Sequence, residues 1–107
     1  MTQNIPRDRI MAFIPKVREM IRYKNYSECE NLIASYMTEY PHAPEPHNLM
    51  GVLLESMGDH PAGMKHFRAA WSLDPTYLPA RHNLEHFSTF FSKRNCAYDE
   101  SDCRTIS

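Results

Sequence analysis

The feature that most constrains the fold of this chain is a repeat of 34 residues. Two polar breaks, Tyr23–Tyr26 and Met57–His60, separate stretches with helical periodicity and lie 34 residues apart. Pro41 and Pro75, each of which closes a stretch, share this offset. Small or apolar residues also recur at it, in the pairs Cys29 with Gly63, Ile33 with Phe67, and Tyr36 with Ala70. Five correspondences at one offset indicate two copies of one structural unit.

The stretches between the breaks have the spacing of amphipathic α-helices. From Tyr26 to Tyr40, for example, apolar residues follow the i, i+3, i+4 pattern. Asn25 is placed to cap this helix, with Glu28 in the capping-box position. Gly58 is expected to end a helix in the left-handed conformation, and Asp59 to cap the next one. The sequence predicts five helices, at about 7–22, 26–40, 46–57, 60–73 and 77–92.

Pro15 lies inside the first predicted helix. Because proline lacks a backbone N–H and its ring clashes with the preceding turn, it is expected to kink this helix or delay its start.

Charge and hydropathy narrow the classes of function. The 107 residues carry a net charge of −1, so bulk charge makes no case for binding nucleic acid or an anionic membrane. The charge is segregated, since residues 1–24 are basic and residues 25–64 contain acids but no Lys or Arg. No apolar run is long enough to insert into a membrane, and no secretory signal is recognisable. Three cysteines without framework spacing indicate free thiols and a cytoplasmic protein.

The pattern resembles the tetratricopeptide repeat, a helix-turn-helix unit of 34 residues. The match is best over 44–77, where Gly51 stands at the small position of the first helix and Gly58-Asp59-His60 matches the turn. Phe67 and Ala70 match the packing pair of the second helix, and Leu73-Asp74-Pro75 matches the ending. Residues 10–43 match more loosely, with Val17 in place of the small residue.

The resemblance implies an all-α fold, a short right-handed α-solenoid of antiparallel helix pairs with about five helices. Its parts are a flexible N-terminus (1–6), a single helical domain (7–92) and a disordered tail (93–107). Within the domain we expect repeats at about 10–43 and 44–77 and a capping helix at 78–92.

A possible catalytic motif lies in the last predicted helix. His82, Glu85 and His86 spell H-x-x-E-H, the zinc-binding and general-base pattern of one class of metallopeptidases. A catalytic zinc needs a third protein ligand, and the enzymes of this class take it from a much larger domain. We therefore interpret the motif as accidental and expect no catalytic residue, no metal and no cofactor. Weak zinc binding by His82 and His86 with Cys96 and Cys103 is a minor alternative.

The resemblance also implies a binding surface. In tetratricopeptide arrays the first helix of each pair lines a concave groove that receives an extended peptide or a partner helix. The corresponding positions in this chain are Ile14, Arg18, Arg22, Asn48, Val52, Glu55, His82, His86 and Thr89. The lysine and asparagine of the family's carboxylate clamp are replaced by Ile14 and Arg18, so binding of chaperone C-terminal tails is not expected.

The function that these observations predict is a non-enzymatic protein–protein interaction module with an adaptor or assembly role. Its partner would be a protein or peptide. The alternative is a self-associating structural unit, such as a homodimer, because short arrays leave apolar end surfaces. A zinc-dependent hydrolase that uses the H-x-x-E-H stretch is a third, less favoured hypothesis.

Overall fold

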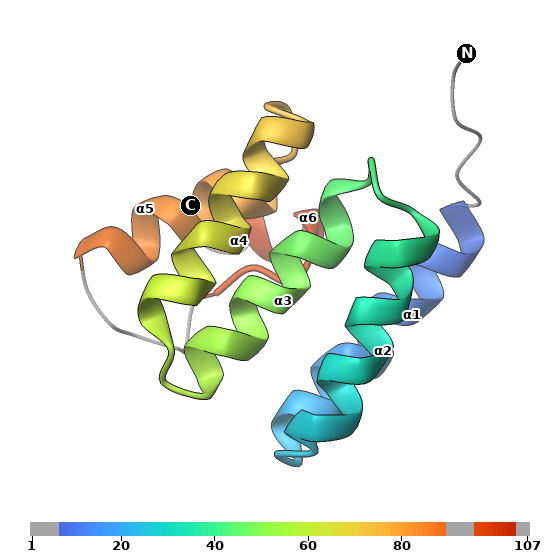
Figure 1. Ribbon diagram of the computed structural model, residues 1–107. Coiled ribbons are helices and arrows are strands. Elements are labelled where there is room, and N and C mark those ends of the chain that lie inside the picture. Colours follow the sequence, from blue (N-terminus) through green and yellow to red (C-terminus); the bar gives the residue numbers. More distant parts are fainter. Residues whose placement is uncertain (1–6, 90–95, 105–107) are drawn as a thin grey trace.

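The chain folds into a single layered row of helices. A computed structural model describes residues 7–89 and 96–104, and no strand occurs within these ranges. The helices are α1 (Arg7–Arg22), α2 (Tyr26–Glu39), α3 (Pro44–Ser56), α4 (His60–Leu73), α5 (Leu78–Thr89) and the short α6 (Glu100–Arg104). Successive helices from α1 to α5 run back and forth beside one another, as Figure 1 shows. The predicted all-α helical-repeat fold is confirmed. None of the described helices combines the length and apolar character needed to cross a membrane.

The helix ends lie close to their predicted positions. α3 begins at Pro44, two residues before the predicted start, because proline is compatible with the first turn of a helix. α5 is described as far as Thr89. The expected flexible N-terminus at 1–6 and the last three residues of the predicted capping helix, 90–92, lie outside the described residues.

The 34-residue period recurs in the backbone at the ends of the helices. Lys24 and Gly58, one period apart, have positive φ angles of 61° and 90°. Gly58 therefore has the left-handed conformation that the sequence predicts, and Lys24 adopts it without the freedom of glycine. Matching hydrogen bonds follow in pairs: Asn25 N to Met20 O (2.9 Å) with Asp59 N to Leu54 O (2.8 Å), Tyr40 N to Tyr36 O (2.8 Å) with Asp74 N to Ala70 O (3.1 Å), and Ala43 N to Tyr40 O (3.1 Å) with Tyr77 N to Asp74 O (3.0 Å).

One of the two predicted side-chain caps is present. The carboxylate of Asp59 accepts a hydrogen bond from the backbone N–H of Ala62 at 3.3 Å. Asn25 occupies the N-cap position of α2, but its side chain makes no capping hydrogen bond. The capping box predicted for Asn25 and Glu28 is thus wrong, because the backbone at Asn25 does not turn its amide toward the helix.

Pro15 does not delay α1, which begins at Arg7 and continues through the proline. Its ring lies on the exposed side of the helix. The carbonyl one turn earlier, at Met11, lies on the same solvent-facing side, where the side chain is 54% exposed. Water can therefore satisfy the carbonyl that loses its helical donor.

The closest helix contact joins α3 to α4 at Gly51. A Cβ atom on Gly51 would lie 2.4 Å from the ring of Phe67, so only glycine fits beneath this ring. One period earlier the equivalent residues are Val17 and Ile33, both fully buried. We infer that the smaller Ile33 leaves the room that Val17 fills. The first pair therefore keeps a well-packed contact although it lacks the small residue.

This contact predicts the effect of adding one methyl group. Gly51→Ala should lower the free energy of unfolding by about 1–3 kcal/mol, because overpacking against Phe67 outweighs the better helix propensity of alanine. Gly63→Ala is the matched control, since its new methyl group meets the flexible side chain of Glu55 instead of a ring. Urea denaturation followed by circular dichroism measures both. A Gly51→Ala protein as stable as wild type, or less harmed than Gly63→Ala, would contradict the packing argument.

Candidate functional site

Three first helices, α1, α3 and α5, present polar side chains on one side of the array. Arg18 comes from α1, Asn48 from α3 and Asn83 from α5. We call the surface formed by these three side chains the groove. Both asparagines are completely buried, with exposed fractions of 0%. A buried amide must find hydrogen-bond partners inside the protein, so what these amides bind identifies what the groove holds.

The groove is filled by the chain's own C-terminal segment, residues 96–104. Figure 1 draws this segment in red, behind α3 and α4. Asn48 Nδ2 donates to the carbonyl oxygen of Ala97 at 3.0 Å, and Asn83 Nδ2 donates to the same oxygen at 2.8 Å. The amide nitrogen of Ala97 in turn donates to Asn83 Oδ1 at 2.7 Å. Asn83 Nδ2 also donates to Asn48 Oδ1 at 2.9 Å, which links the two amides.

Arg18 holds the other part of the C-terminal segment. Its guanidinium nitrogen Nη2 donates to Asp102 Oδ2 at 2.7 Å, and the guanidinium carbon lies 4.8 Å from the centre of the Tyr98 ring. The same carboxylate oxygen accepts the backbone N–H groups of Tyr98 (2.9 Å) and Asp99 (3.3 Å). Asp102 therefore folds the segment onto α6 and anchors it to α1.

The predicted tail is thus partly wrong. The sequence predicts disorder over 93–107, but residues 96–104 follow a defined course with a short helix. The prediction rested on the scarcity of aliphatic residues in the tail. It missed that Ala97, which has an exposed fraction of 0%, is held by hydrogen bonds from two distant helices instead of by apolar packing.

Of the predicted groove residues, Arg18 and Asn48 contact the C-terminal segment. Ile14 and Val52 are buried in the core, and Arg22 is exposed on the last turn of α1. Glu55 is also buried, and its Oε2 lies 2.7 Å from Nδ1 of His60. The side chain of Thr89 lies outside the described part of the structure. The predicted set therefore spans more than the surface that the segment uses.

Asn83 was not among the predicted groove residues, although the sequence contained a signal for it. It lies three residues after Ala80 and four before Phe87, and all three side chains are buried. Leu84, which the sequence places on the core stripe, is only partly buried. The buried stripe of α5 is therefore turned by one residue, and an asparagine at its centre needs a dedicated partner.

The predicted histidines lie next to the segment. The rings of His82 and His86 are stacked with centroids 5.8 Å apart, and both side chains are half-buried. Leu78, Arg81, His82, Glu85 and Cys103 line a shallow pocket of about 190 Å³. Across residues 7–89 and 96–104, no three His, Cys, Asp or Glu side chains come close enough to hold a metal ion together.

The cysteines are shielded rather than activated. Burial raises the pKa of the Cys29 thiol to about 11 and that of the Cys96 thiol to about 11. Burial also raises the pKa of Cys103, and the neighbouring carboxylates of Asp102 and Glu100 raise it further. The sequence predicted exposed thiols at 96 and 103 with pKa values raised by nearby acids. The direction is the same, but the larger cause is burial in the groove.

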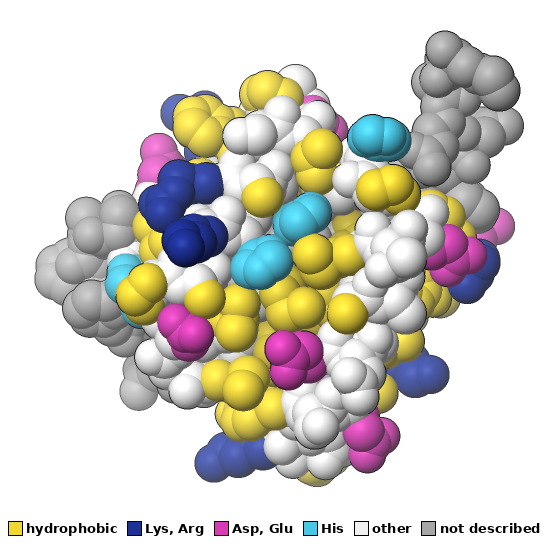
Figure 2. All heavy atoms as spheres, viewed as in Figure 1, with side chains coloured by type: hydrophobic (Ala, Val, Ile, Leu, Met, Phe, Trp, Pro, Cys, Tyr) yellow, Lys and Arg dark blue, Asp and Glu magenta, His cyan; other side chains and the backbone are white. Residues whose placement is uncertain are grey.

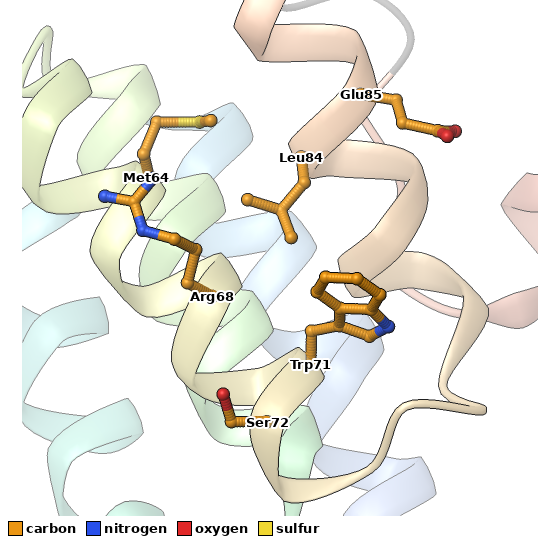
Figure 3. A pocket seen from close by; sticks show the side chains of 6 residues that line it. All are labelled: Met64, Arg68, Trp71, Ser72, Leu84 and Glu85. Carbon is orange, nitrogen blue, oxygen red and sulfur yellow. The ribbon is translucent and has the colours of Figure 1, made fainter.

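The array also offers a second concave surface, between α4 and α5. An open pocket of about 480 Å³ is lined by Met64, Arg68, Trp71, Ser72, Leu84 and Glu85. Figure 3 shows the Trp71 and Leu84 side chains approaching each other from the two helices. Trp71 remains 43% exposed, so this apolar surface is available for contact with another molecule.

The face turned toward the viewer in Figure 2 has a different character. Hydrophobic side chains are interspersed there with histidines and isolated acids, and basic side chains lie nearer its edges. His47 of α3 and His66 of α4 form a half-buried pair, with their Nδ1 atoms 3.1 Å apart. Burial lowers the pKa of both rings, which favours the neutral pair that can share one hydrogen bond.

Removing the amide of Asn83 should release the C-terminal segment. Asn83→Ala leaves Ala97 N–H without its acceptor and Asn48 Oδ1 without its donor. We expect a loss of about 1–3 kcal/mol of stability and fast hydrogen exchange at the Ala97 amide. Asn31→Ala, at an exposed position of α2, is the control and should leave the protection of Ala97 unchanged. An Ala97 amide equally protected in Asn83→Ala and in wild type would show that Asn83 does not hold the segment.

Comparison with known proteins gives one distant relative. No family model matches the chain, and no solved structure matches it. The chain is 28% identical over 79 residues to the DnaJ homolog subfamily C member 7 homolog of Dictyostelium discoideum. The matched region covers 74% of this chain but only 15% of that protein. The described structure and this likeness together place the chain among all-α helical-repeat folds, with a distant similarity to part of a larger DnaJ homolog.

Proposed function

We propose that the chain is a non-enzymatic interaction module of the tetratricopeptide type, which binds an extended peptide of a protein partner in the groove. Its role would be that of an adaptor or assembly factor in the cytoplasm. The turns, the small residue at Gly51 and the 34-residue recurrence of the backbone hydrogen bonds support the tetratricopeptide assignment.

The observation that carries the proposal is the way in which Ala97 is held. Asn48 and Asn83 bind both the N–H and the C=O of one residue in an irregular segment. Such bonds read the main chain and not a side chain, so the same two amides can hold many sequences. Arg18 adds a preference for a carboxylate. A main-chain clamp beside one cation is well suited to bind acidic peptides.

The comparison with the DnaJ homolog is compatible with this proposal. The likeness spans most of the chain and a small part of the relative, as expected for a module that recurs within larger proteins.

Peptide selection against the full chain tests the proposal. Peptides selected from a random library should bind wild type and lose about tenfold or more in affinity in the double variant Asn48→Ala with Asn83→Ala, because several hydrogen bonds of about 0.5–1.5 kcal/mol each are removed. Asn31→Ala is the control for a surface asparagine. Selected peptides that bind the double variant as tightly as wild type would place the binding surface elsewhere.

Self-association is the second candidate, and the pocket between α4 and α5 favours it. Its apolar lining lies near the C-terminal end of the array, where a following helix would pack in a longer array. Analytical ultracentrifugation over a wide concentration range decides between the two candidates. We expect a mass near 12.5 kDa throughout. A dimer that dissociates in Trp71→Glu, but not in the exposed control Tyr23→Glu, would support self-association through this pocket instead.

A further inference from the structure

The C-terminal segment occupies the surface at which we propose that partners bind. Its contacts fall into three parts: a small residue, Ala97, whose main chain is clamped; an aromatic ring, Tyr98, under Arg18; and a carboxylate, Asp102, paired with Arg18. The small residue is required by space, because Ala97 is fully enclosed. The segment thus shows what chemistry the groove accepts.

The segment leaves part of the groove unsatisfied. Nε of Arg18 and the hydroxyl of Tyr77 are buried and have no hydrogen-bond partner among the described residues. Burial raises the pKa of Tyr77, and the carboxylates of Glu45 and Asp99 raise it further, so its hydroxyl keeps its proton as a donor. Two buried donors without acceptors cost free energy. A ligand that supplies these acceptors would fit the groove better than the segment does.

The groove also contains groups that limit its preference for acids. Glu45 lies at the buried end of α3, close enough to Tyr77 to affect its titration. Arg18 is therefore the cation that selects a carboxylate, and its position fixes where along the peptide this carboxylate must lie. In the segment it lies five residues after the clamped alanine, on the first turns of a short helix.

We propose that the C-terminal segment is an internal competitor for the groove and that the partner presents the same chemistry: a small residue, an aromatic residue directly after it, and a carboxylate four residues later on a helical turn. This inference rests on the proposed function. A tethered segment acts at a high effective concentration. A partner in solution therefore binds only the fraction of molecules in which the segment has left the groove.

Ala97→Asp in the full chain tests the competition. The charge cannot enter the closed site of Ala97, so the variant should open the groove without altering Arg18, Asn48 or Asn83. The probe is a fluorescein-labelled synthetic peptide of residues 96–104 with Cys96→Ser and Cys103→Ser. Its affinity for the Ala97→Asp protein should be about tenfold or more above that for wild type, as expected when most wild-type molecules are closed. Equal affinities in the two proteins would overturn the competition.

Three further peptides test the chemistry of the ligand. Peptides with Ala97→Asp or Asp102→Asn should bind the open variant several-fold more weakly than the parent peptide. The peptide with Glu100→Gln is the matched control, because Glu100 is exposed and carries the same charge as Asp102. It should bind like the parent peptide. A peptide with Asp102→Asn that binds as tightly as the parent would remove the carboxylate from the proposal.

A milder pair of full-chain variants covers the case in which Ala97→Asp fails to fold. Asp102→Asn breaks the contact with Arg18 at the surface of the groove, and Glu100→Gln is its control. The parent peptide should bind Asp102→Asn several-fold more tightly than Glu100→Gln, with both proteins shown to be folded by circular dichroism. Identical binding by the two would contradict the competition.

The proposed function and this inference fail in different ways. Peptides from a random library, selected on the open variant, should need Asn83 for binding and should be enriched in the small–aromatic–acid pattern. Peptides that need Asn83 but lack the pattern would overturn the inferred partner while the groove remains a binding site. Peptides that bind equally after Asn83→Ala would overturn the proposed function itself. A wild-type dimer that Ala97→Asp converts to monomer would instead show that the segment exchanges between two copies.

Discussion

The buried amide pair of Asn48 and Asn83 is the interaction on which the C-terminal half of the structure depends. Two carboxamides in a closed interior would be strongly unfavourable without partners. They bind each other once and bind the main chain of Ala97 three times. The amides therefore satisfy one another only in the presence of a third backbone, and this requirement brings the end of the chain back across α3 and α5.

This requirement explains why a polar, short segment is ordered. An isolated stretch with the composition of 96–104 cannot bury enough apolar surface to offset the entropy of ordering. Here the segment contributes one enclosed alanine, one ring against a guanidinium and one ion pair, and the helices supply preformed partners for its main chain. The same preformed partners would bind another chain of suitable shape.

The parts of the fold that the sequence predicted are those set by local rules. The turns at Lys24 and Gly58, the cap at Asp59 and the helix ends depend on residues within a few positions of each other, and they lie where the 34-residue period places them. The parts that it missed depend on distant partners. Asn83 was overlooked because its burial depends on Ala97, and Ala97 was assigned to a disordered tail because its order depends on Asn83. Each residue is intelligible only with the other.

The groove prediction failed for a related reason. A repeat pattern assigns positions on a helix, but the rotation of α5 was off by one residue, which exchanges Leu84 for Asn83 on the buried stripe. The last first helix is the one most open to such a shift, because no second helix follows it within the described residues to fix its rotation. The C-terminal segment takes over part of this task on the groove side. The side between α4 and α5 keeps its open apolar pocket, so the end of the array closes one of its two surfaces with its own chain and leaves the other exposed.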